Sequence, residues 1–208
     1  MLQRRLLKVE GTVQGVGFRP YVHRLAAARN LHGFVRNDAG RVFIDIQGEE
    51  APLDAFCREL AVAPPALSWI KSVHTRRAKP LRRAEFCIRP SGASPSQKNG
   101  GTFPPDVATC DTCVAELFDP TLRRFGHAFI SCTDCGPRFT AMYRAPYDRE
   151  RTNMAVFSPC AQCQQEYHDP DNRRFHAEAI ACPNCGPTLV SIAPDALHPS
   201  GTDRKSVG

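Results

Sequence analysis

The sequence predicts an α+β fold in two parts: a sheet-and-helix domain, then a small duplicated unit. Residues 7–13 alternate between apolar and polar side chains, as in a half-buried strand, and residues 18–26 follow helical spacing. The second half carries eight cysteines in two sets with identical spacing. Charge divides in the same way, with 16 Lys and Arg against 8 Asp and Glu in residues 1–91, and 11 against 13 in residues 92–208. The basic first part therefore suits an anionic substrate or partner.

The stretch between the predicted strand and helix has the features of an oxyanion site. Gly15 and Gly17 permit backbone angles that other residues resist, so amide N–H groups can approach an anion closely. Pro20 suits the first turn of a helix, whose N-terminus carries free N–H groups and partial positive charge. Arg19 adds a permanently charged fork that matches phosphate or carboxylate geometry. A phosphate ligand is favoured, and a tight turn with a surface arginine is the alternative interpretation.

Residues 9–19, VEGTVQGVGFR, closely resemble the signature of acylphosphatases, and Asn37 stands where that family has its second signature residue. The resemblance covers roughly residues 1–90 and implies hydrolysis of acyl phosphates without a metal. It implies that Arg19 binds the phosphate and that Asn37 orients the attacking water. The loop that would surround the phosphate consists of Gln14, Gly15, Val16, Gly17 and Phe18. Without the resemblance, Asn37 would be interpreted as a turn residue.

The rest of residues 1–91 predicts a βαββαβ order, the ferredoxin-like arrangement. A helix is expected after Pro52, where apolar residues recur at i, i+3, i+4 and i+7. Further strands are expected at residues 34–37, 42–47, 69–77 and 85–89. Connection rules favour an antiparallel four-stranded sheet with both helices on one face. Such a sheet would bring the glycine loop and the strand of Asn37 to one edge.

The second half repeats itself at an offset of 50 residues. The pattern Cys-x2-Cys-x18-Cys-x2-Cys occurs twice, and the Arg-Arg-Phe run at 123–125 recurs at 173–175. The predicted domains are therefore the acylphosphatase-like domain at 1–91, a linker rich in Ser, Gly and Pro at 92–105, two repeats at 106–190 and a polar tail at 191–208.

Four cysteines at this spacing can surround a zinc ion tetrahedrally. Because no histidine is shared between the repeats, we expect two structural Zn²⁺ ions held by cysteine alone. The expected ligands are Cys110, Cys113, Cys132, Cys135, Cys160, Cys163, Cys182 and Cys185. Ligation within each repeat is preferred, and exchange of ligands between the repeats is the alternative. Disulfides and redox CxxC pairs are the rival interpretations. Adjacent CxxC pairs in a cytosolic chain disfavour disulfides, and four such pairs in two identical spacings are too many for a redox site.

Both halves together resemble the HypF carbamoyltransferases of nickel–iron hydrogenase maturation. The resemblance runs over about residues 4–190 and includes Phe18-Arg19-Pro20, residues 132–140 and residues 146–149. It implies carbamoyl phosphate as substrate, in the synthesis of cyanide ligands, and an acceptor protein of the HypE type as partner. HypF proteins continue with adenylating and carbamoyl-transfer domains. We therefore expect no transfer by these 208 residues alone, which form either a fragment or a short paralogue.

Two other functions compete with acyl phosphate hydrolysis. One is a non-catalytic zinc-binding module that docks a partner and keeps a vestigial acylphosphatase fold. The other is nucleic-acid binding, which is weakest because the cysteine-rich half is acidic and has no RNP-like or C2H2 pattern. No signal peptide or membrane span is evident, so a cytoplasmic location is expected.

Overall fold

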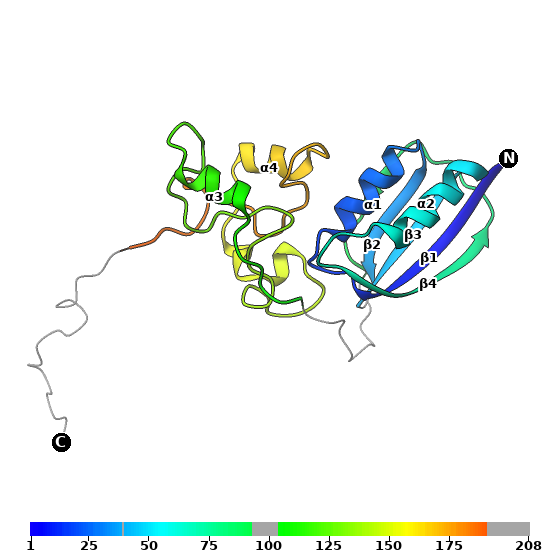
Figure 1. Ribbon diagram of the computed structural model, residues 1–208, viewed down its shortest axis with the longest axis horizontal. Coiled ribbons are helices and arrows are strands. Elements are labelled where there is room, and N and C mark those ends of the chain that lie inside the picture. The colour runs from blue at the N-terminus through cyan, green and yellow to red at the C-terminus, as the bar shows by residue number, and fades with distance from the viewer. Residues whose placement is uncertain (39, 93–103, 191–208) are drawn as a thin grey trace, which may run out of the picture.

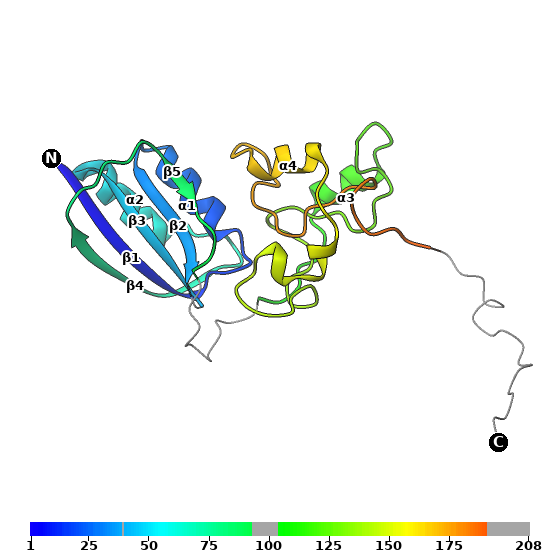
Figure 2. The same cartoon turned by 180° about the vertical axis from the view of Figure 1, so that it is seen from behind.

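The computed structural model of the chain describes residues 1–38, 40–92 and 104–190. These residues form two parts that lie side by side, a sheet covered by helices and a part with short helices and long loops (Figure 1, Figure 2). Most of the predicted linker and the whole predicted tail lie outside the described residues. In the ranges given, no helix has both the length and the apolar character needed to cross a bilayer.

A five-stranded sheet forms the first part, with its strands in the order β4-β1-β3-β2-β5. The strands are β1 (Leu2–Thr12), β2 (His32–Asp38), β3 (Arg41–Glu49), β4 (Trp69–Ala78) and β5 (Phe86–Ile88). The first four pair antiparallel, as predicted. β5 instead pairs parallel with β2, with Gly33 opposite Phe86 and Val35 opposite Ile88. The strand expected at residues 85–89 thus joins the sheet, which has five strands where four were expected, because the chain returns after β4 to the opposite edge.

Two helices cover one face of this sheet, α1 (Phe18–Ala27) and α2 (Glu50–Val62) (Figure 1). Alternate strand residues such as Leu7, Val9 and Ile44 are completely buried against Phe56 and other helix residues. Each buried side chain of this size contributes about 1.5–3 kcal/mol relative to exposure, so this layer stabilises the fold. The sheet thereby fixes the positions of the loops at its ends.

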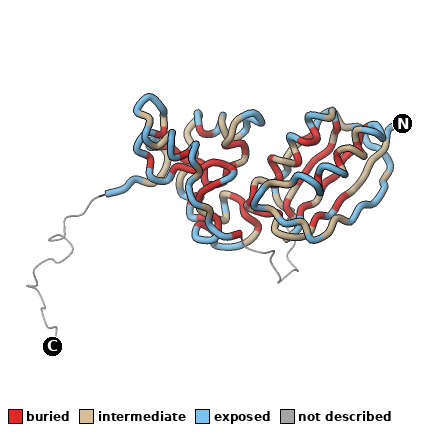
Figure 3. The backbone as a smooth tube through the Cα atoms, in the orientation of Figure 1, coloured by how far each residue is buried: buried red, intermediate tan, exposed pale blue. Residues whose placement is uncertain are grey.

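The second part is organised by its cysteines. Each repeat begins with a short helix directly after its first cysteine: α3 (Asp111–Phe118) follows Cys110, and α4 (Ala161–His168) follows Cys160. Two 3-10 helices, η1 (Arg149–Arg151) and η2 (Asn153–Val156), lie between the repeats. Buried and exposed stretches alternate along this part (Figure 3), and the two repeat clusters are built largely from the cysteines themselves.

The two repeats hold each other through crossed ion pairs. Arg174 in the second repeat lies 2.6 Å from Glu116 in the first, and Arg124 in the first lies 2.5 Å from Glu166 in the second. The Nε of each arginine also donates to a backbone carbonyl of the other repeat. Because every partner is offset by 50 residues, the repeats pack with approximate two-fold symmetry.

Candidate active site and metal centres

The loop between β1 and α1, residues 13–17, carries two glycines with left-handed backbone conformations. Gly15 has a φ of 67° and Gly17 a φ of 71°, and Gly17 caps α1. A Cβ atom added to Gly15 would lie 2.7 Å from Pro104, and one on Gly17 would lie 3.2 Å from Thr133. Glycine is therefore favoured twice here, by the backbone conformation and by the close approach of the second part.

Arg138 of the first repeat fixes one peptide group of this loop. Its Nε donates to the carbonyl of Gly15, and its other N–H groups donate to the carbonyls of Thr133 at 2.8 Å and Cys135 at 2.9 Å. In a trans peptide the N–H lies opposite the carbonyl. The contact therefore turns the Val16 N–H away from the second part.

Arg19, in the first turn of α1, reaches into the second part of the chain. Its Nη1 donates to Asp148 Oδ1 at 2.8 Å, and its Nη2 donates to Glu178 Oε1 at 2.8 Å and to the Tyr147 carbonyl at 3.0 Å. The Arg19 and Glu178 side chains are only 10% and 4% exposed, so the ion pair is shielded from water. Breaking such a pair by removing one partner costs about 3–5 kcal/mol, so these contacts couple the two parts.

Burial and charge shift the pKa values of this cluster. Burial disfavours the charged form of Arg19, but the carboxylates of Glu178 and Asp148 outweigh it and raise the pKa of Arg19 above its usual value. Burial also raises the pKa of Glu178, in spite of the attraction to Arg19. Arg19 therefore remains charged at any physiological pH.

His176 is a neutral neighbour of the same cluster. Burial lowers the pKa of His176 to about 3, and the positive charge of Arg19 adds to this effect. Its Nδ1 lies 3.1 Å from the Tyr167 hydroxyl, which donates to Glu178 Oε2 at 3.0 Å. His176 therefore carries no charge near neutral pH.

A cavity lies between the glycine loop and the second part. It is lined from the first part by Gln14, Gly15, Gly17, Arg19 and Pro20, and from the second part by Thr133, Arg138, Tyr147, His176 and Glu178, among others. The described residues that line it do not include Asn37. The structure thus brings Arg19 and the glycines to one cavity and leaves Asn37 outside its walls.

Asn37 lies at the end of the sheet where the glycine loop begins. It pairs in register with Val42, which pairs in turn with Val9 near the end of β1. Asn37 is 1% exposed, and neither polar atom of its amide has a hydrogen-bond partner in the parts of the chain that the structure describes. An unpaired buried amide costs about 1–3 kcal/mol, so a polar ligand or water is expected there.

The side chains of Gln14, Val16 and Phe18, the other predicted loop residues, make contacts within the first part. Val16 and Phe18 are 3% and 1% exposed and pack in the core of the first part. The Nε2 of Gln14 donates to the carbonyl of Arg41 at 3.1 Å. Their contact with a phosphate stays a prediction.

Nothing in the sequence indicates directly that Asp148 and Glu178 are the partners of Arg19. Asp148 lies in residues 146–149, which resemble the HypF family, but that resemblance assigns no role to Asp148. Glu178 breaks the repeat, because Ala128 stands at the equivalent position 50 residues earlier. That break is the one signal that could have marked Glu178 as a residue with a separate role.

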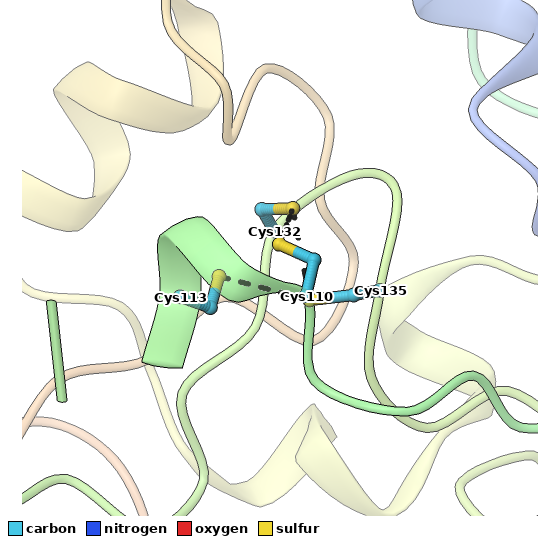
Figure 4. A group of neighbouring side chains, drawn as sticks. All are labelled: Cys110, Cys113, Cys132 and Cys135. Atoms are coloured by element: carbon cyan, nitrogen blue, oxygen red, sulfur yellow. Dashed lines mark hydrogen bonds between the residues drawn. The ribbon is translucent and has the colours of Figure 1, made fainter. Parts of the chain in front are cut away.

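Each set of four cysteines converges on one point, and Figure 4 shows this for the first set. Sγ–Sγ distances there are 3.9 Å for Cys110–Cys132, 3.7 Å for Cys132–Cys135 and 3.6 Å for Cys135–Cys113. The second set has corresponding distances of 3.8, 3.6 and 3.7 Å. Sulfurs about 2.3 Å from a tetrahedral zinc ion lie about 3.8 Å apart, so both sets fit zinc. Each set comes from one repeat, as the spacing favoured.

Arginines from one repeat contact the sulfurs of the other. Arg173 donates to Cys110 Sγ at 3.1 Å and to Cys113 Sγ at 3.2 Å, and Arg123 donates to Cys163 Sγ at 3.4 Å. Four thiolates around a divalent cation leave a net negative charge, which a neighbouring guanidinium stabilises. Each repeat therefore supplies a charge partner for the cysteine set of the other.

The fold and the site define a class: an acylphosphatase-type sheet whose glycine loop packs against a pair of four-cysteine fingers. The acylphosphatase family model matches residues 6–88, and the HypF finger model matches residues 109–142 and 160–192. An acylphosphatase from Thermotoga maritima is 39% identical over 84 residues, which cover 40% of this chain and 92% of that protein. The chain belongs to the acylphosphatase family through its first part.

Longer matches join both parts. Carbamoyltransferase HypF from Rhizobium leguminosarum is 47% identical over 154 residues, which cover 74% of this chain and 20% of that protein. A crystal structure of full-length HypF in the phosphate- and nucleotide-bound form matches with a TM-score of 0.84 and 41% identity, over 90% of this chain and 25% of that chain. The chain thus has the acylphosphatase and finger regions of HypF, and it spans about a fifth of the length of the curated HypF relatives.

Proposed function

We propose that the chain hydrolyses acyl phosphates, with carbamoyl phosphate as its substrate, at the glycine loop beside Arg19. The observation that carries this proposal is the buried, unpaired amide of Asn37 at the loop end of the sheet. A buried amide without a partner is a cost to the fold, and a substrate or an attacking water would supply the missing hydrogen bonds. Residues 1–91 form the catalytic domain in this proposal.

The reaction needs positioning more than covalent chemistry. The loop N–H groups and Arg19 hold the phosphoryl oxygens, while Asn37 orients a water molecule towards phosphorus. The water oxygen bonds to phosphorus as the bond from phosphorus to the acyl oxygen breaks, which releases phosphate and the carboxylate, and the proton of the water passes to solvent. A carboxylate is a good leaving group, so this chemistry proceeds without a metal ion at the loop.

The finger region has a structural role in this proposal. Zn²⁺ in each set of four cysteines would be held by all four thiolates, with no position left for a substrate, so two structural ions per chain are proposed. Their fit rests on the sulfur distances given above. Zinc would supply folding free energy to the second part, and the chemistry would stay at the loop.

In the cell, the chain would serve as the acylphosphatase and finger module of a HypF-type carbamoyltransferase in the cytoplasm. Such a module supplies carbamate for the synthesis of hydrogenase cyanide ligands, in a pathway that ends on an acceptor protein of the HypE type. These 208 residues would carry out the hydrolysis and require joined or docked carbamoyltransferase domains for the transfer. The similarity to HypF over both parts supports this placement.

Hydrolysis of carbamoyl phosphate and of a generic acyl phosphate by the zinc-loaded chain, without further metal, tests the proposal. Arg19→Ala should lower kcat/KM by about 100-fold or more, because a central phosphate donor is lost. Arg24→Ala, on the exposed side of α1, is the matched control and should leave the rate unchanged. Since Arg19→Ala also breaks buried ion pairs, Asn37→Ala serves as a second variant that leaves them intact.

The competing function is a non-catalytic docking module. The pairing of Arg19 with Asp148 and Glu178 favours it, because a structural ion pair would leave no arginine for a substrate. Zinc-loaded wild-type chain that hydrolyses neither compound above the rate of buffer would establish this alternative.

A further inference from the structure

The hydrogen bonds of Arg19 leave no free pair of adjacent N–H donors for an oxyanion. A guanidinium can chelate an oxyanion through the pair Nε and Nη2, or through the pair Nη1 and Nη2. Both pairs require one N–H of Nη2. Both Nη2 donors of Arg19 are already used, one by Glu178 at 2.8 Å and one by the Tyr147 carbonyl at 3.0 Å. A phosphoryl group can therefore be chelated only after one of these partners leaves.

Glu178 is the partner that can leave at the lowest cost. Its second oxygen, Oε2, also accepts from the Tyr167 hydroxyl at 3.0 Å and from the backbone N–H of Arg149 at 3.1 Å. The carboxylate therefore keeps two hydrogen bonds when Oε1 gives up Arg19. The Tyr147 carbonyl, the other partner of Nη2, accepts from Arg19 alone among the described residues, so it would be left unpaired. Asp148, the partner of Nη1, also lacks an alternative, because its Oδ2 is buried without a partner among the described residues.

We propose that Glu178 is an exchangeable counterion of Arg19, and that the phosphoryl group of the substrate displaces it on binding. The proposal rests on the function proposed for the loop, and it assigns to the second finger a residue that acts through Arg19. Glu178 is a positioning residue, because it sets how readily Arg19 accepts an anion.

The exchange also selects between anions. A phosphate dianion brings more charge to Arg19 than the carboxylate that it replaces, so its attraction offsets the loss of the internal ion pair. A simple carboxylate such as acetate brings the same charge as Glu178 and gains nothing from the exchange. The site therefore favours phosphate over carboxylate ligands, although guanidinium geometry fits both.

Calorimetric titration of the zinc-loaded chain with inorganic phosphate tests the exchange. Glu178→Gln replaces a charged acceptor with a neutral one, so phosphate should bind about tenfold more tightly, and KM for acyl phosphate should fall with kcat changed by less than about threefold. Asp45→Asn is the matched control, because Asp45 is equally buried at 4% exposure and pairs with arginines elsewhere. Its phosphate affinity should equal that of the wild type.

Unchanged or weaker phosphate binding by Glu178→Gln would overturn the exchange and make Glu178 a structural residue. A lower kcat with unchanged KM would do the same. If Glu178→Gln loses its zinc or fails to fold, Tyr167→Phe is the variant that tests the exchange. It removes one of the hydrogen bonds that Glu178 keeps after it leaves Arg19, so phosphate should bind several-fold more weakly than to the wild type. Phosphate binding that survives Arg19→Ala contradicts instead the function proposed for the loop, so the two failures are distinguishable.

Discussion

The carboxylate of Glu178 lies 2.8 Å from the guanidinium of Arg19 across 159 residues of sequence, and it joins the second finger to the first helix. Both groups are buried, so their contact depends on how the two parts pack. The surroundings of the candidate phosphate loop therefore include residues from both parts of the chain. The predictions below address the loop, the fingers and the residues between them.

Arg138→Ala should lower acyl phosphate hydrolysis about tenfold. The substitution frees the Gly15 carbonyl, so the peptide that aims the Val16 N–H can turn and the oxyanion loses one fixed donor. Steady-state kinetics with hydrogen exchange at the loop would measure both effects. Arg144→Ala, at an exposed position of the same region, is the control. A rate equal to that of the wild type would show that the loop holds its shape without Arg138.

Asn37→Ala should separate activity from stability. Its amide is buried and unpaired, so removing it should lower the free energy of unfolding by less than about 1 kcal/mol, while turnover should fall at least tenfold. Urea unfolding and kcat measured on the same preparation would test this. A large loss of stability would mean that the amide has a structural partner instead of a ligand.

Loss of one cysteine set should weaken the other. Arg173 and Arg123 contact sulfurs across the repeats, so Cys132→Ser in the first set should also reduce the zinc affinity of the second. Zinc content by mass spectrometry should fall below one ion per chain under mild chelation. Cys57→Ser, outside both sets, should retain two ions. A variant that keeps one ion at wild-type affinity would show that the fingers are independent.

Chelation of the wild type should unfold the fingers and leave the sheet folded. A small module without a large apolar core draws its folding free energy from its metal, whereas the sheet has its own buried layer. Circular dichroism should retain the strand signal while the finger amides exchange freely. Simultaneous loss of both signals would mean that the sheet depends on the fingers.

Acidification should destabilise the chain through His176. Its folded pKa of about 3 lies below the unfolded value of about 6.5, so its stabilising contribution is complete above pH 6.5 and is lost as the pH falls. By pH 5 the loss should reach about 2 kcal/mol. Urea unfolding of His176→Asn, which tolerates the φ of 52° at this position, should depend less on pH between 5 and 7. Zinc content must be equal in both proteins, and identical pH profiles would contradict the assignment.

Local patterns predict the sheet and the loop well, because alternation around Leu7 and the spacing of Gly15 and Gly17 are properties of neighbouring residues. They also predict a strand at residues 85–89, but they do not predict that this strand, β5, pairs parallel with β2, because that pairing depends on where the chain returns. The cysteine sets are predictable because their spacing is itself the signal. The pairing of Arg19 with Glu178 depends on the packing of two separate parts, which no local pattern encodes.

The near-symmetry of the fingers ends at the residues that face Arg19. Where the second repeat has His176 and Glu178, the first has Gly126 and Ala128. The two repeats share a cysteine framework but make different contacts with the first part. The first repeat binds the glycine loop through Arg138, and the second binds Arg19 through the carboxylate of Glu178. The copies are therefore not interchangeable, and a chimera with their order reversed would keep its metal framework while presenting the wrong surface to the helix.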